Sequence, residues 1–197
     1  YSVIRELRTR FDHFRATGDE SNIPADLRRI VYHIAVQHGG EQEYQTVQKI
    51  AENPNSPTSK IAAMLSMTQT QDKGLIEKTL AYIETDVKNQ DVEYYFNGFS
   101  CNYAARRRAA EFFQQNYHKF VERFEGNFSF RYIVPGIFDS FSTNKDAQEI
   151  EEFFRDKDVS KFNMAYAQAS ISCYLLTATH LVFITDARNY PHECQMA

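Results

Sequence analysis

The chain has 197 residues, of which 43% are hydrophobic and 24% charged, a length and composition that suit one soluble domain or one segment of a larger protein. Its formal net charge of −4 lacks the overall basic character that nucleic-acid-binding domains normally show, so we expect no nucleic-acid partner. With only 7 Gly and 5 Pro, the residues of sharp turns are scarce, which argues against a β-rich or disordered chain.

Apolar residues recur at three- and four-residue spacing from the start of the chain, as on the buried stripe of a helix. The first predicted helix ends at Gly18, which supplies a left-handed cap. Pro24 suits the first turn of a second helix, and the pair Gly39-Gly40 ends it. The expected buried face of this second helix consists of Leu27, Ile30, Val31 and Ile34. A third helix is broken at Pro54.

The middle of the chain continues this pattern without a strand-like interval. Pro57 opens a fourth predicted helix, Asp72 caps a fifth, and a sixth begins near Val92. The longest helical periodicity extends from Ala105 to Phe124 and predicts one continuous helix. Aromatic pairs such as Phe112-Phe113 are expected in the core, because they are the largest apolar side chains.

The last predicted helices have recognisable starts. Pro135 lies inside one of them, carrying Phe130 to Phe141, and predicts a kink there. Thr143 and Asp146 form a box-like cap for the next helix, and a final helix starts at Asp158 or Ser160. Short loops between helices make consecutive helices antiparallel neighbours. We therefore expect an all-α fold, and within it an α-solenoid of antiparallel helix pairs of the HEAT or armadillo kind rather than a compact bundle.

Several short motifs follow one another between Ile23 and Ser170. They are Ile23-Pro24-Ala25-Asp26-Leu27-Arg28, Thr70-Gln71-Asp72 with Leu75-Ile76, Arg106-Arg107, Glu111-Phe112-Phe113, Arg123-Phe124-Glu125-Gly126-Asn127 and Glu151-Glu152-Phe153-Phe154. Each motif is weak alone. In this order they resemble the C-terminal helical domain of the zinc aminopeptidase family that includes the puromycin-sensitive, aminopeptidase N and endoplasmic-reticulum enzymes.

The resemblance implies that the chain is a fragment of an enzyme. Residues 1–170 would be the C-terminal helical-repeat domain, and residues 171–197 a divergent, poorly ordered tail, because the similarity stops at Ile171. Enzymes of this family remove N-terminal residues from peptides with a zinc ion held by a His-Glu-x-x-His motif and a downstream Glu. The resemblance therefore implies zinc in the parent enzyme, and as partners its N-terminal catalytic domains and a peptide substrate.

The chain itself lacks the residues for that chemistry. A zinc peptidase helix needs two His four residues apart, and none of the 6 His has such a partner. We therefore expect no catalytic residue, no metal site and no cofactor in this chain. Its 3 widely separated Cys suggest neither a disulfide framework nor a zinc site, which indicates a reducing compartment. A cytoplasmic location is the default expectation, because no export signal is recognisable in this sequence. No apolar run reaches the ~20 residues of a membrane span.

The run Arg106-Arg107-Arg108 is the strongest local charge. Three cations near the start of a helix oppose its macrodipole, so something is expected to compensate them. They pair with carboxylates such as Asp91 or Glu111, or they are simply solvated. In the functional alternative, one of them faces the groove and binds a peptide carboxylate through its planar guanidinium. Because only Arg106 and Arg107 match the family pattern, these two are the candidate substrate-groove residues.

Two functions remain open at this point. The ordered motifs favour a non-catalytic C-terminal domain of a zinc metallo-aminopeptidase, which shapes the peptide chamber of the parent enzyme. The alternative is a free-standing helical-repeat scaffold that binds a protein or peptide in its concave face. Composition does not separate the two, because a fold does not fix a function.

Overall fold

The computed structural model describes residues 2–125 and 129–171, and within them every regular element is a helix. The all-α class is therefore confirmed. The expected tail lies, from residue 172 on, outside the described residues, so the boundary at residue 170 stays a prediction.

The described part of the chain is a succession of short helices joined by short connections. They are α1 (Ser2–Thr17), the 3₁₀ turn η1 (Ala25–Leu27), α2 (Arg28–His38), α3 (Glu41–Glu52), α4 (Pro57–Met67), α5 (Lys73–Thr85), the 3₁₀ turn η2 (Asn89–Asp91), α6 (Val92–Ser100), α7 (Arg106–Gln115), α8 (Tyr117–Arg123), α9 (Phe130–Phe138) and α10 (Asn144–Phe154). Residues 163–171 are helical as well.

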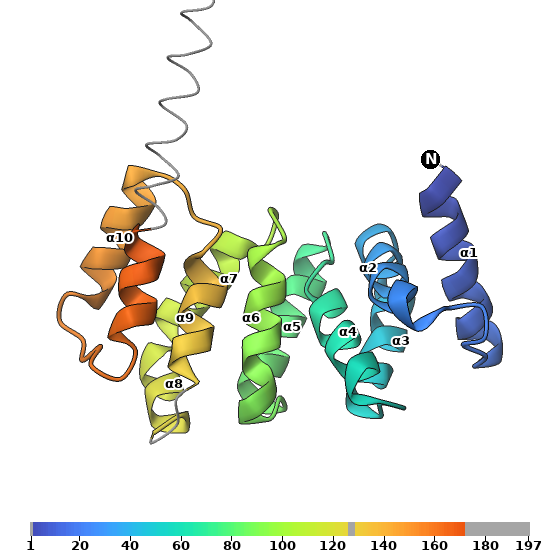
Figure 1. Ribbon diagram of the computed structural model, residues 1–197, viewed down its shortest axis with the longest axis horizontal. Helices are drawn as coiled ribbons and strands as arrows, with labels where there is room; N and C mark the ends of the chain where they lie inside the picture. The colour runs from blue at the N-terminus through green and yellow to red at the C-terminus, as the bar shows by residue number, and fades with distance from the viewer. Residues whose placement is uncertain (1, 126–128, 172–197) are drawn as a thin grey trace, which may run out of the picture.

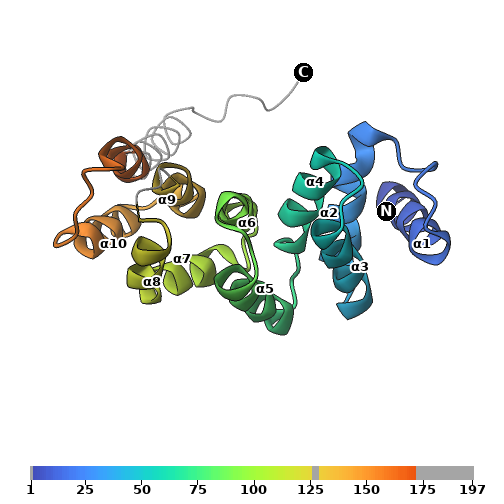
Figure 2. The ribbon, with the colours of Figure 1, turned by 90° about the horizontal axis from the view of Figure 1, so that it is seen from below.

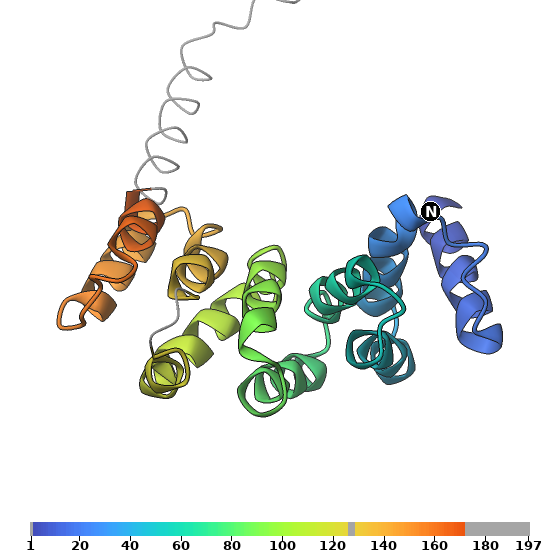
Figure 3. The ribbon, with the colours of Figure 1, turned by 60° about the horizontal axis from the view of Figure 1, so that its bottom comes forward.

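The helices follow one another along a curved row that starts at α1 and ends beyond α10 (Figure 1). Along this row α4 packs against α2 and α6, and α6 packs against α9. Figures 2 and 3 show α2, α4, α6 and α9 on the inner side of the curve and α3, α5, α7 and α8 on its outer side. The row is thus two helices deep; its assignment to the HEAT or armadillo kind stays a prediction.

Caps that the sequence predicts fix several helix ends. Gly18 adopts a φ of 73° after α1, a conformation that a residue with a side chain avoids. The Asp72 carboxylate accepts a hydrogen bond from the Leu75 amide at 3.0 Å and starts α5. Thr143 caps α10, and its own amide donates to the Asp146 carboxylate at 3.0 Å, which completes the predicted capping box.

The single helix predicted from Ala105 to Phe124 is wrong: the structure divides it into α7 and α8 at Asn116. The side-chain amide of Asn116 donates to the Phe112 carbonyl oxygen at 2.9 Å, and the Asn116 backbone amide donates to the same oxygen at 3.1 Å. Asparagine competes in this way with regular helical bonding. Apolar periodicity runs through both helices and gives no sign of the break.

The predicted buried face of the second helix is also partly wrong. Leu27 is 39% exposed and Ile30 is 48% exposed. Leu27 belongs to η1 rather than to α2, and the buried face of α2 is formed by Val31, Tyr32, Ala35 and Val36. Ile30 lies on the opposite side of the helix from this stripe, because successive residues are rotated by about 100°.

Two other helix boundaries in the structure differ from the predicted ones. The helix that carries Phe130 ends at Phe138, so Phe141 lies in the following connection. The last helix begins at residue 163, later than the predicted starts at Asp158 and Ser160. In both places the sequence pattern included an aromatic residue in the helix, Phe141 in the first and Phe162 in the second. Each of these residues is buried but lies just outside the helix.

Aromatic side chains form the core of the half that holds α6 to α10, as predicted. The Phe113 ring stacks on Phe120 at 5.6 Å between centroids and meets Phe96 edge-on at 5.9 Å. Tyr117 meets Phe153 edge-on at 5.4 Å. Such pairs are favourable beyond the area that they bury. They join inner and outer helices into one core.

Glycine sets how closely the inner helices approach. A Cβ atom on Gly98 in α6 would overlap the hydroxyl oxygen of Thr68, which follows α4. A Cβ atom on Gly136 in α9 would overlap the side chain of Asn97 in α6. The carbonyl of Gly98 also accepts a hydrogen bond from the Gln69 side chain at 2.7 Å. Close packing of α4, α6 and α9 therefore depends on these two glycines.

Candidate functional site

The candidate arginines lie at the start of α7, and a buried asparagine fixes that start. The Asn102 side chain donates to the carbonyl oxygens of Thr68 and Thr70, each at 2.8 Å. The Asn102 carbonyl in turn accepts from the amides of Ala105 and Arg106. Asn102 thus ties the first turn of α7 to the segment that follows α4.

Arg107 is engaged in the packing of α7 against α10. Its guanidinium donates to the Asp146 carboxylate at 2.5 Å and lies 3.6 Å from the Glu149 carboxylate. It also lies over the Phe141 ring, 4.5 Å from the centroid. The Asp146 side chain is only 3% exposed, so this ion pair is buried on its acidic side. Arg107 therefore has carboxylate partners within the domain.

Burial alone raises the pKa of the Asp146 carboxyl, but its hydrogen bonds more than offset that effect. They come from Arg107, from the side chain of Thr143 and from the backbone amides of Ser142 and Thr143, and the net result is a pKa below the ordinary value. The group is therefore a carboxylate at neutral pH, and its charge neutralises Arg107.

Arg108 binds a residue of α5 rather than of α10. Its guanidinium donates two hydrogen bonds to the Glu77 carboxylate in α5, at 2.7 and 2.9 Å. This paired geometry raises the pKa of Arg108, chiefly through the hydrogen bond that its guanidinium donates to Glu77. Carboxylate pairing therefore compensates two of the three arginines, through Asp146 and Glu77, whereas Asp91, which the sequence suggested, pairs with Lys60 at 2.5 Å.

Arg106 differs from its two neighbours. It donates to the Ser140 carbonyl oxygen at 3.1 Å and lies over the Tyr103 ring, 4.8 Å from the centroid. Tyr103 is 84% exposed. Within residues 2–125 and 129–171, no carboxylate lies within ion-pair distance of Arg106. Of the two candidate residues, Arg106 is thus the one whose charge is not already neutralised.

The described residues contain no group of three or more His, Cys, Asp or Glu side chains placed to hold a metal ion. The same part of the chain has no helix that is both long enough and apolar enough to cross a membrane.

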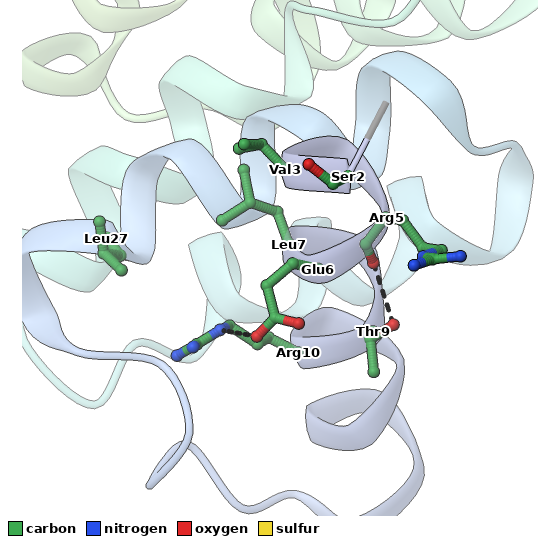
Figure 4. Close-up of a pocket in the computed structure, with 8 residues that line it drawn as sticks. All are labelled: Ser2, Val3, Arg5, Glu6, Leu7, Thr9, Arg10 and Leu27. Atoms are coloured by element: carbon green, nitrogen blue, oxygen red, sulfur yellow. Dashed lines mark hydrogen bonds and ion pairs between the residues drawn. The ribbon is translucent and has the colours of Figure 1, made fainter.

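A shallow cleft of about 400 Å³ lies between α1 and η1, and the sequence did not predict it. Figure 4 shows Val3 and Leu7 on α1 and Leu27 on η1 around it, with the ion pair of Glu6 and Arg10 beside them. Periodicity in the sequence shows that a helix has an apolar face, but it does not show which neighbour leaves part of that face open.

Comparison with known proteins identifies relatives of the chain. The family model described as "ERAP1-like C-terminal domain" matches residues 1–171. Aminopeptidase 2, mitochondrial, of Saccharomyces cerevisiae is 28% identical over 155 residues, which are 78% of this chain and 16% of that protein. Endoplasmic reticulum aminopeptidase 2 of Bos taurus is 26% identical over 152 residues, 77% of this chain and 16% of its own length.

Aminopeptidase N of Canis lupus familiaris is 25% identical over 150 residues, 75% of this chain and 15% of its own length. The chain thus spans about a sixth of the length of the curated relatives that it matches.

Proposed function

The chain belongs to the family of ERAP1-like C-terminal domains, and from this premise we propose that it is the non-catalytic part of a zinc aminopeptidase that forms a wall of the peptide chamber. The observation that carries the proposal is the family match over residues 1–171. The zinc ion and the residues that activate water would come from the catalytic domains of the parent enzyme, which are its partners in this proposal.

The absence of a metal-binding His pair from the sequence supports a non-catalytic role. A zinc peptidase of this kind holds its metal with two His on one helix face and a Glu between them. None of the 6 His in the 197 residues stands four positions from another. The contribution of this domain to turnover would therefore be to position the peptide, which lowers the entropic part of the barrier.

The curved row of helices supports the role of a wall. A row two helices deep has an inner side, formed here by α2, α4, α6 and α9 (Figure 3). In this proposal an extended peptide would lie along that side, as ligands do on the concave faces of helical-repeat proteins. The close contacts at Gly98 and Gly136 hold three of these helices at fixed spacing. A rigid wall of this kind selects substrates by length, because only a long peptide reaches contacts far from the reacting bond.

Arg106 is the residue that we propose for such a distant contact. It is the first residue of the outer helix α7, but it donates to the Ser140 carbonyl just after the inner helix α9, so the contact would lie at the edge of the inner side. Its guanidinium lies beside an exposed tyrosine ring and has no carboxylate partner among the described residues. A guanidinium with free N–H groups binds a carboxylate in two parallel hydrogen bonds. Arg107 is the weaker candidate, because its guanidinium already forms ion pairs with Asp146 and Glu149.

The reading frame upstream of Tyr1 tests the proposal directly. We expect it to continue into a segment that encodes a His-Glu-x-x-His motif in the same polypeptide. An initiating Met close to Tyr1 would instead support the free-standing scaffold and contradict the proposal. Sequencing the complete transcript is sufficient to distinguish the two.

A further inference from the structure

A second cleft lies at the other end of the row, between α8 and the connection that follows α10. Its volume is about 500 Å³, within the usual range of small-ligand sites. Its lining is aromatic and aliphatic at several positions: Tyr117, Val121, Phe124, Phe130 and Phe162. The Phe130 and Phe162 rings stack with centroids 5.2 Å apart, so this lining is part of the packed core.

The charges around this α8 cleft are unbalanced. Four carboxylates line it: Glu122, Glu125, Asp156 and Asp158. The two lysines are Lys157 and Lys161. Lys157 is occupied, because its amine donates to the Phe153 carbonyl and lies 4.0 Å from the centroid of the Phe153 ring. The Asp158 carboxylate accepts from the Ser160 amide at 2.9 Å.

The remaining charges are therefore mostly negative. Among the residues that the structure describes, Glu122, Glu125 and Asp156 have no ion-pair partner. The basic groups of the lining left to oppose them are Lys161 and the imidazole of His118. Each of these three carboxylates is exposed. An anionic rim over an apolar floor attracts a cation and excludes an anion.

Tyr117 adds an unused polar group to the floor. Its side chain lines the cleft and the residue is only 5% exposed. Within residues 2–125 and 129–171 its hydroxyl has no protein hydrogen-bond partner, yet it is not among the fully buried polar atoms that lack one, so it opens to the cleft. The Lys157 ammonium lies 5.5 Å from the centroid of the Tyr117 ring. A ligand with hydrogen-bond donors would provide a partner for the hydroxyl.

From this combination we propose that the α8 cleft binds an arginine side chain of a peptide or protein segment. The aliphatic part of arginine would lie on Val121 and the aromatic floor, and its guanidinium would meet Glu122 and Asp156 at the rim. The planar guanidinium suits carboxylates and aromatic faces together, which an ammonium group does not. This inference does not depend on the proposed chamber function.

The test measures the binding of blocked tripeptides to the full 197-residue chain, with titration calorimetry for the affinity and NMR chemical shifts for the location. One peptide is acetyl-Ala-Arg-Ala-amide, and the other carries citrulline, which has the same shape without the charge. We expect the arginine peptide to bind at least about tenfold more tightly, as charge-assisted contacts require. The methyl signals of Val121 should shift on binding.

Variants at the rim locate the contact. The double variant Glu122→Gln, Asp156→Asn should weaken binding of the arginine peptide about tenfold or more. Asp26→Asn is the matched control, because Asp26 is an exposed carboxylate in η1 at the opposite end of the row. Circular dichroism should confirm that each variant is folded.

Four outcomes would overturn the inference. One is equal affinity for the arginine and citrulline peptides. The second is an unchanged affinity in the double variant, and the third is an equal loss in the Asp26 control. The fourth concerns a third peptide, acetyl-Ala-Lys-Ala-amide, measured in the same way: binding as tight as that of the arginine peptide would contradict recognition of the guanidinium.

Discussion

The guanidinium of Arg107 in α7 and the carboxylate of Asp146 in α10 lie 2.5 Å apart, donor to acceptor. The same carboxylate accepts from the backbone amides of Ser142 and Thr143, at 3.1 and 3.0 Å. One buried acid thus caps α10 and holds it to α7. The pairing also explains how α7 tolerates Arg107 near its start, where the helix macrodipole disfavours a cation.

Replacing Arg107 should destabilise the domain more than replacing its neighbour Arg108. Arg107→Leu leaves Asp146 buried without its charged partner, so we expect the free energy of unfolding to fall by about 1–3 kcal/mol. Arg108→Leu removes a more exposed pair with Glu77 and should cost about 0–1 kcal/mol. Urea unfolding of the two variants measures the difference. Equal losses would show that the Arg107 pair has no special structural role.

The lowered pKa of Asp146 predicts a dependence of stability on pH. A carboxyl whose pKa is lower in the folded state contributes stability above its unfolded pKa of about 3.9, and that contribution is lost as the pH falls through the folded pKa. In Asp146→Asn, the stability deficit relative to the parent chain should therefore shrink as the pH falls below about 4. Urea unfolding at pH 7 and pH 3 measures it. A deficit that stays constant with pH would contradict the assignment.

The glycines between inner helices should not tolerate a methyl group. Gly98→Ala places a Cβ atom against the Thr68 side chain and the Leu65 carbonyl, which we expect to cost about 1–3 kcal/mol. Gly40→Ala serves as the control, because no atom lies within 4 Å of its Cβ position. Its cost should be no more than about 0.5 kcal/mol, from the poorer helix cap. Similar melting temperatures for both variants would mean that α4 and α6 separate easily.

The isolated chain should have no zinc-dependent peptidase activity. Its sequence offers no pair of His at the spacing that holds a catalytic zinc. The assay uses aminoacyl-naphthylamide substrates with added zinc, and a complete aminopeptidase as the positive control. Turnover that survives repurification and is abolished by a chelator would contradict the proposed division of roles.

Local signals predicted most of the helix starts. Asp72 and Thr143 cap helices because the bonds involved join residues three apart, so the sequence contains both partners. The division at Asn116 was missed, because an asparagine in a helical pattern is compatible with either outcome. Ile30 was placed on the wrong face, since periodicity alone does not say which of two apolar stripes meets the neighbouring helix.

The candidate site was predictable only in part. The run of arginines stands out in the sequence, and the need for compensating charge follows from the helix dipole. The partners Asp146 and Glu77 lie 39 and 31 residues away, and only the packing of α7 between α10 and α5 brings them near. The α8 cleft was missed for the same reason, because its walls come from segments that are distant in the sequence.

The chamber role is tested most directly by measuring how replacement of Arg106 changes the hydrolysis of substrates of different length. In the complete parent enzyme, Arg106→Ala should lower kcat/KM for a long peptide about tenfold to a hundredfold, because a charge-assisted contact is lost. The same variant should leave the hydrolysis of a single-residue chromogenic substrate unchanged. Arg108→Ala is the control, since Glu77 already neutralises that charge.

Kinetics of these two variants, with the long peptide and the chromogenic substrate measured side by side, provide the decisive comparison. The account predicts a loss on the long peptide alone, and only for Arg106→Ala. Equal losses on both substrates, or a long peptide handled as well as by the parent enzyme, would contradict a peptide-contacting wall at Arg106.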